Sequence, residues 1–125
     1  MTLGMVPFMF AFLLLVIGLY AIVAKRNLIK VIVGLLIMDY AANLFLVLVG
    51  YRTPAEGAPV APILTSGAAG AADLAARAVD PLPQALVLTS IVIGLSVTAL
   101  VVALAIRLYE KYGTFDTGVM RNLKG

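Results

Sequence analysis

The 125-residue chain contains no cysteine, no histidine and no tryptophan. Without cysteine and histidine it lacks disulfides, thiol chemistry and the usual protein ligands of zinc, haem and iron–sulfur clusters, so we expect the chain to carry no metal and no cofactor. Charged residues make up only 12% of the chain, against about 25% in soluble proteins. Hydrophobic residues make up 63%, which predicts an integral membrane protein and not a partner of nucleic acid.

Hydrophobic runs are long enough to cross a bilayer in three places. An α-helix rises about 1.5 Å per residue, so about 20 apolar residues span a hydrocarbon core of about 30 Å. We predict helices over about residues 5–24, 29–50 and 84–108, a loop at 51–83 and a polar tail at 109–125. The predicted fold class is an all-α membrane protein with three transmembrane helices, forming a single membrane domain over residues 1–125.

The loop at 51–83 is rich in residues that break helices, with three prolines and three glycines before residue 80. Its alanine-rich second half, 68–79, is compatible with a short helix at the membrane surface. Asp80 precedes Pro81 and Pro83 and is placed to cap the third long helix. Prolines in a first helical turn cost little because the N–H groups there have no intrahelical partner.

The basic residues predict the orientation of the chain. Seven of the nine lie at the connection between the first two predicted helices or from residue 107 onward, and two lie in the loop at 51–83. Because Lys and Arg are retained on the cytoplasmic side, we predict the N-terminus outside, the C-terminus in the cytoplasm and the loop outside. The seven are Lys25, Arg26, Lys30, Arg107, Lys111, Arg121 and Lys124, and the two are Arg52 and Arg77.

One acidic residue, Asp39, lies in the middle of the second hydrophobic run, Val31–Val49. Insertion scales put the cost of an aspartate at the membrane centre at about 2.5–3.5 kcal/mol, so such a residue normally faces protein or water and marks a functional site. Asn43 follows four residues later and shares its helix face. Two roles stay open: a protonated, structural hydrogen-bond donor, or a group that relays protons or pairs with a cation.

Few other polar groups lie within the spans. The third span contains four hydroxyl side chains. Hydroxyls in membrane helices most often hydrogen-bond to a carbonyl of their own helix or to a neighbouring helix, so a purely structural role is possible for all four. Three of them, Thr89, Ser90 and Ser96, are also candidates for an ion or proton path with Asp39 and Asn43; the fourth is Thr98. Gly34 and Gly94 are predicted helix-packing positions, because glycine allows another helix to approach closely.

Motifs of stand-alone enzymes are missing from the chain. It contains no glycine-rich nucleotide loop and no Ser/His/Asp set, and the segments between its spans are too short for a catalytic domain. We therefore expect a transport or structural subunit and not an enzyme by itself. A rotor-ring subunit also carries a mid-membrane carboxylate, but a third span and a long loop argue against it. A small multidrug exporter is disfavoured by the lack of a fourth span and of an acid in the first helix.

Two stretches resemble a known family. Residues 26–38, RNLIKVIVGLLIM, resemble the second helix of the NuoK family, the three-helix small membrane subunit of complex I. Residues 80–94, DPLPQALVLTSIVIG, are more similar still to its MrpC/MnhC branch, which comprises the C subunits of Mrp-type sodium/proton antiporters and of related modules in energy-converting hydrogenases. The tail, with YGTFDT at 112–117, is closer to the hydrogenase-associated members.

The resemblance implies a multi-pass subunit of a prokaryotic cytoplasmic membrane that helps to form a lateral path for Na⁺ and H⁺. Its implied partners are antiporter-like large subunits and NuoJ-like small subunits. NuoK-type subunits carry glutamates at positions that align with Leu36 and near Gly94, and both are absent here. Asp39 lies close to the face of Leu36, so we expect it to replace the first glutamate one turn deeper. Three assignments stay open: an antiporter subunit, the same subunit in the membrane arm of a hydrogenase or related respiratory complex, or a purely structural assembly subunit.

Overall fold

The computed structural model describes residues 3–64 and 68–120, and in these ranges the regular structure is helical. A short 3₁₀ helix, η1 (Leu3–Met5), leads into α1 (Val6–Ala24), followed by α2 (Leu28–Val49), α3 (Ala68–Arg77) and α4 (Pro81–Tyr112). Three of these helices, α1, α2 and α4, are long and apolar enough to cross a membrane. The predicted all-α class with three spans is thereby confirmed.

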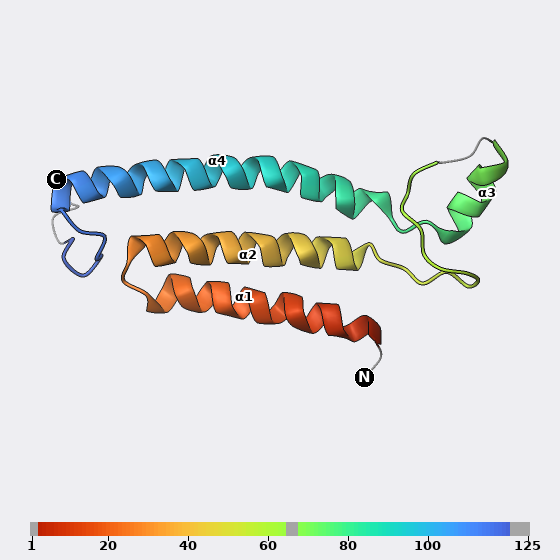
Figure 1. Ribbon diagram of the computed structural model, residues 1–125, viewed down its shortest axis with the longest axis horizontal. Coiled ribbons are helices and arrows are strands. Elements are labelled where there is room, and N and C mark those ends of the chain that lie inside the picture. The colour runs from red at the N-terminus through yellow and green to blue at the C-terminus, as the bar shows by residue number, and fades with distance from the viewer. Residues whose placement is uncertain (1–2, 65–67, 121–125) are drawn as a thin grey trace.

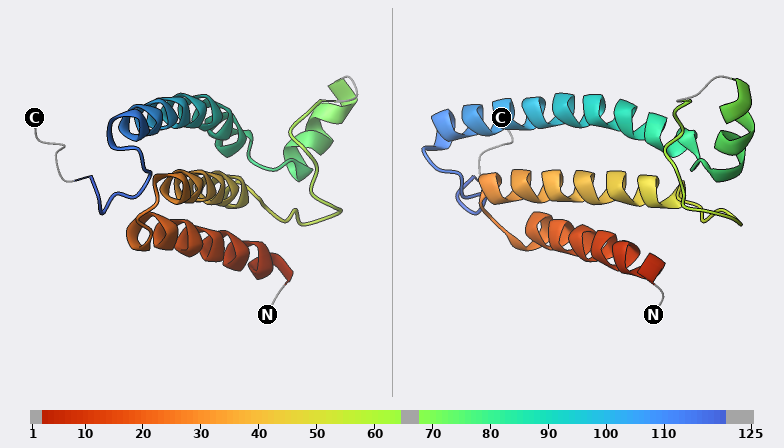
Figure 2. Two further views of the ribbon diagram at one scale, coloured as in Figure 1. Left: turned by 60° about the vertical axis from the view of Figure 1, so that its left-hand side comes forward. Right: turned by 45° about the vertical axis from the view of Figure 1, so that its right-hand side comes forward.

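The three long helices lie in a row with α2 in the middle (Figures 1 and 2). Helix α2 packs against α1 on one side and α4 on the other, whereas α1 and α4 make no contact within the described residues. A row of three helices leaves broad apolar surfaces uncovered, and Val23 and Leu95 are 76% and 72% exposed. Only α2 is covered from two sides, so a polar side chain at mid-depth is best sheltered on this helix.

Close packing of α1 on α2 depends on two glycines. A β-carbon on Gly34 would lie 2.8 Å from Ala21 Cβ and 3.0 Å from the Gly18 carbonyl oxygen, and one on Gly18 would lie 2.9 Å from the Gly34 carbonyl oxygen. Larger residues in such a contact force backbone shifts that typically cost about 1–3 kcal/mol.

Asn27 caps the start of α2 by accepting a hydrogen bond from the backbone N–H of Ile29 at 2.9 Å.

Helix α4 is longer than the span predicted at 84–108. It starts at Pro81 because Asp80 caps it, accepting from the backbone N–H of Leu82 at 3.0 Å, and because both prolines fall in its first turn. It ends at Tyr112, where Gly113 adopts a left-handed conformation (φ 69°) and its N–H bonds to the Tyr109 carbonyl at 2.7 Å. The additional residues form the turns outside the most apolar stretch.

The described parts of the segment between α2 and α4, residues 51–64 and 68–80, form a cap at one end of the long helices, with α3 as the short helix expected in the alanine-rich segment. Arg52 donates to the carbonyl oxygens of Ala75 and Ala78 at 2.6 and 2.7 Å, and so satisfies the C-terminal end of α3. The backbone N–H of Asp80 donates to the Gly50 carbonyl at 3.0 Å. A β-carbon on Gly50 would lie 2.8 Å from Pro83 Cγ. The cap thus fixes the start of α4 against the end of α2.

At the opposite end, part of the tail folds back on the turn between α1 and α2. The backbone N–H of Leu28 donates to the Phe115 carbonyl at 2.9 Å, and that of Thr117 donates to the Arg26 carbonyl at 2.8 Å. The Phe115 ring stacks on Tyr109 with centroids 4.5 Å apart. We call residues 113–120 the tail clasp. The sequence predicted only a polar tail here, because the clasp depends on backbone pairing between distant segments.

Candidate functional site

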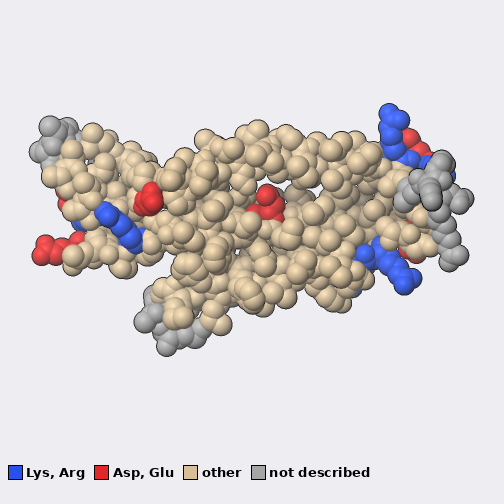
Figure 3. Space-filling view, turned by 180° about the vertical axis from the view of Figure 1, so that it is seen from behind, with Lys and Arg blue, Asp and Glu red and all other residues tan. Residues whose placement is uncertain are grey.

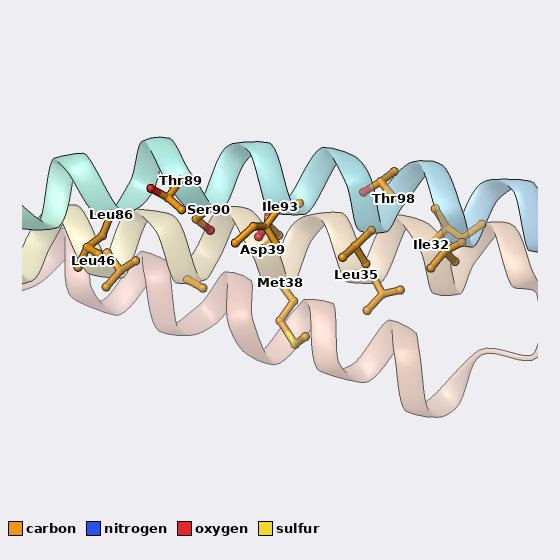
Figure 4. Close-up of a pocket in the computed structure, with 14 residues that line it drawn as sticks. Ile32, Leu35, Met38, Asp39, Leu46, Leu86, Thr89, Ser90, Ile93 and Thr98 are labelled. Carbon is orange, nitrogen blue, oxygen red and sulfur yellow. The ribbon is translucent and has the colours of Figure 1, made fainter.

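The candidate site lies between α2 and α4, half-way along both helices. Asp39, twelfth of the 22 residues of α2, is half-buried, and its side chain lies between α2 and α4 (Figure 4). Its carboxyl group faces Gly94 on α4. A β-carbon on Gly94 would lie 2.8 Å from Asp39 Oδ2 and 3.3 Å from Cγ. Gly94 therefore leaves the space that the carboxyl group on α2 occupies.

Asn43 is the one hydrogen-bond donor to the Asp39 side chain within the described residues. Its Nδ2 donates to Asp39 Oδ2 at a long 3.5 Å. Asn43 is only 9% exposed, and its own Oδ1 has no hydrogen-bond partner among the residues that the structure describes. A buried polar atom without a hydrogen bond costs about 1–3 kcal/mol, so the isolated chain leaves this pair incompletely satisfied.

A groove runs beside the Asp39 carboxyl group between α2 and α4. It has a volume of about 540 Å³ and most of its lining is apolar. Figure 3 shows a single acidic patch half-way along the otherwise uncharged spans, next to gaps between the two helices. The α2 wall consists of Ile32, Leu35, Met38, Asp39, Ala42 and Leu46, and the α4 wall of Leu86, Thr89, Ser90, Ile93, Gly94, Val97, Thr98 and Val101.

The structure brings part of the predicted polar set together. Ser90 and Thr89 line the groove, and the Thr89 hydroxyl also donates to the Ala85 carbonyl at 3.5 Å. Ser96 does not line it: the residue is exposed elsewhere on α4, and its hydroxyl donates to the Val92 carbonyl at 3.0 Å. Gly34 lies on the α1 side of α2, away from Asp39.

Thr98 lines the groove but was not among the residues predicted for the path. It lies four residues after Gly94, so both occupy one face of α4, and this spacing is the signal that locates it. In the sequence, Ser96 is an equally good candidate because it is closer to Gly94. A difference of two positions turns its side chain by about 200° around the helix, away from α2.

The chemistry available at this site is that of a single carboxyl group. Within residues 3–64 and 68–120 no cluster of three His, Cys, Asp or Glu side chains is close enough to hold a metal ion. Asp39 can gain and lose a proton or pair with a cation, and Ser90 and Thr98 can hydrogen-bond to water in the groove. A proton relay also requires an onward acceptor, which this chain does not place beside Asp39 in the part that the structure describes.

Comparison with known proteins identifies the family. A model of the family described as NADH-ubiquinone/plastoquinone oxidoreductase chain 4L matches residues 6–125. The Na(+)/H(+) antiporter C1 subunit of Staphylococcus saprophyticus is 37% identical over 102 residues, which cover 82% of this chain and 79% of that protein. The Na(+)/H(+) antiporter C subunit of Alkalihalophilus pseudofirmus is 38% identical over 109 residues, 86% of each chain.

A solved structure is similar in fold and in sequence. It is a chain of the membrane-bound sulfane sulfur reductase, described as an archaeal respiratory membrane complex. The TM-score is 0.76 and the identity 46%, with 90% of this chain and 94% of that chain covered. The resemblance carried by residues 26–38 and 80–94 is confirmed: the chain is a multi-pass membrane protein that belongs to the NADH-ubiquinone/plastoquinone oxidoreductase chain 4L family.

Proposed function

We propose that this chain is the C subunit of a multisubunit Na⁺/H⁺ antiporter module and that Asp39 forms part of its ion path. Relatives named as C subunits of Na⁺/H⁺ antiporters match more than four-fifths of the chain. The observation that carries the proposal is the position of Asp39, a carboxyl group at mid-membrane depth that faces a groove. The chain is not an enzyme by itself in this proposal.

The geometry supports a simple role for each group. The Asp39 carboxyl group takes up and releases a proton, or pairs with Na⁺, at the groove. Asn43 holds the carboxyl group by donating to Oδ2, and Gly94 leaves the space in which the group moves. Ser90, Thr89 and Thr98 supply hydroxyls along the α4 wall, where water enters the path. Ser96 is left out of this path because it faces elsewhere.

Neighbouring subunits complete the path in this proposal. One carboxylate between two helices lacks the next acceptor, and three helices in a row do not enclose a channel. Antiporter-like large subunits and NuoJ-like small subunits are the proposed partners, placed against the uncovered faces of the row. The large exposed apolar surfaces of α1 and α4 are compatible with such contacts and with lipid.

The distribution of charge supports a topology with the C-terminus in the cytoplasm. The turn between α1 and α2 and the end of α4 lie at the same end of the molecule, so Lys25, Arg26, Lys30, Arg107 and Lys111 gather there. At the other end Arg52 binds carbonyl groups of α3, and Arg77 forms a salt bridge with Asp73. The hydrogen bond from Arg77 holds the pKa of Asp73 below its ordinary value. Because positive charge is retained on the cytoplasmic side, we propose that the loop between α2 and α4 lies outside.

A second candidate is the same subunit in the membrane arm of a redox-driven respiratory complex. The sulfane sulfur reductase chain is 46% identical, against 37% and 38% for the two antiporter subunits. The ion-handling role of Asp39 is the same in both cases, and the difference lies in what drives the module.

The composition of the native complex separates these two candidates. We expect affinity purification through this subunit in mild detergent to recover multi-span antiporter-like subunits, identified by mass spectrometry. Their recovery without redox proteins indicates an antiporter, and additional iron–sulfur subunits indicate a respiratory complex. Recovery of the chain without any other membrane subunit would contradict both.

Substitution of Asp39 tests the ion path directly. Asp39→Asn keeps the shape of the side chain but cannot titrate, so we expect Na⁺/H⁺ exchange in proteoliposomes of the purified complex to fall about tenfold or more, as for the loss of a positioned proton-transfer group. Glu56→Gln, in the exposed loop, is the matched control and should leave exchange unchanged. Normal assembly with full exchange in the Asp39→Asn complex would reduce Asp39 to a structural role.

Cysteine labelling tests the topology, because the chain has no cysteine of its own. With Glu56→Cys, an exposed loop position, we expect a membrane-impermeant maleimide to label intact cells. With Lys111→Cys, an exposed position near the end of α4, we expect labelling only after the cells are broken. The reverse pattern would show the opposite orientation.

A further inference from the structure

Contacts between the long helices set the depth of each residue in the membrane. Asp39 lies opposite Gly94, half-way along both helices. Eleven residues further along each helix Gly50 lies against Pro83, so α2 and α4 run side by side in a constant register. With Asp39 at mid-depth, Lys30 lies nine residues away, or about 14 Å along α2. The hydrocarbon core extends about 15 Å from its midplane, so Lys30 lies at its edge.

Lys25 and Arg107 reach the same layer from the other two helices. Ala21 of α1 lies against Gly34, which is about 8 Å along α2 from the level of Asp39. Lys25 follows Ala21 by four residues, which adds about 6 Å. Arg107 lies about 20 Å from the level of Asp39 along α4. Long cationic side chains at these depths extend into the headgroup layer, where the phosphates of the lipids lie.

The cations at this end have few partners within the protein. Among residues 3–64 and 68–120 no salt bridge involves Lys25, Lys30 or Arg107, and all three are exposed. Of the two acidic residues at this end, Asp116 accepts a backbone N–H of the tail clasp at 2.8 Å. The other, Glu110, lies about one turn beyond Arg107, further from the membrane centre. A surplus of positive charge therefore faces the headgroup layer.

The opposite end of the molecule uses its cations internally. On the face that Figure 3 shows, Lys and Arg occur at the two ends of the helices and not along the spans. At the end with the cap, Arg52 donates to two carbonyl oxygens near the end of α3, and Arg77 forms a salt bridge with Asp73. The two ends therefore differ in the positive charge that is free to bind an anion from outside the chain.

Apolar side chains lie exposed directly beside the two lysines, on the side of the membrane core. Val23, two residues before Lys25, is 76% exposed, and Val33, one turn after Lys30, is 47% exposed. A ligand that fits this surface carries negative charge at the level of the lysines and apolar chains below it. A phospholipid has both parts in one molecule.

We propose that this basic end binds an anionic phospholipid, with its headgroup at Lys25 and Lys30 and its acyl chains against Val23 and Val33. A zwitterionic lipid also carries a phosphate, but its own cationic group opposes the lysines, so a net negative headgroup is favoured. In the proposed orientation the lipid belongs to the cytoplasmic leaflet. The inference requires that the chain spans the membrane and does not depend on the proposed ion path.

Photo-labelling of the assembled complex by lipids tests this inference. The purified complex is reconstituted in phosphatidylcholine vesicles with a trace of photoreactive phosphatidylglycerol or, in a parallel sample, of phosphatidylcholine with the same photoreactive acyl chain. After irradiation, mass spectrometry quantifies the lipid adducts on residues 19–33. Lys25→Gln and Lys30→Gln each remove one charge at an exposed position. Arg77→Gln removes the same charge at the opposite end and is the matched control.

We expect phosphatidylglycerol adducts in severalfold excess over phosphatidylcholine adducts. One lysine near an anionic headgroup changes the attraction by about fivefold, so each lysine variant should lose most of this excess, and Arg77→Gln should keep it. Equal labelling by the two lipids, or an excess that survives the loss of both lysines, would overturn the inference. Absence of lipid adducts because another subunit covers the lysines would overturn it as well. Transport is not measured, so none of these results bears on the proposed ion path.

Discussion

The close approach of the Asp39 carboxyl group to Gly94 is the constraint on which the candidate site depends. A carboxyl group at the membrane centre costs about 2.5–3.5 kcal/mol when it is inserted without compensation. Here the cost is reduced because α4 covers the group and Asn43 donates to it. A β-carbon at position 94 would lie 2.8 Å from Oδ2, so the carboxyl group would have to turn away from any larger residue there.

The row of three helices explains why the acid lies on α2. This helix alone has neighbours on both sides, through Gly18 and Gly34 toward α1 and through Gly94 toward α4. The α1 contact is tight and apolar, whereas the α4 contact is fixed at its ends and open in the middle. One side of α2 therefore provides tight packing, and the other provides a polar site beside an open groove. The two functions are separated across a single helix.

Much of this fold follows from local sequence signals. Long uncharged runs give the three spans, Asp80 with its two prolines gives the start of α4, and the spacing of Asp39 and Asn43 gives their shared face. The tail clasp and the Arg52 hydrogen bonds to Ala75 and Ala78 were not predictable in this way. They join segments more than 20 residues apart, and their acceptors are backbone carbonyls, which every residue carries. The atom that lies against Gly94 could not be predicted, because the sequence indicates only that a glycine allows another helix to approach closely.

The measurement that tests the central contact most directly is Na⁺/H⁺ exchange by a Gly94→Ala complex. The new methyl group would lie 2.8 Å from Asp39 Oδ2, and the flexible carboxyl group can turn away, so assembly should be normal while exchange falls severalfold and its pH profile shifts. Gly4→Ala is the matched control, because a β-carbon there has nothing within 4 Å, and it should behave as the unaltered complex. Exchange with an unchanged rate and pH profile in the Gly94→Ala complex would contradict the account.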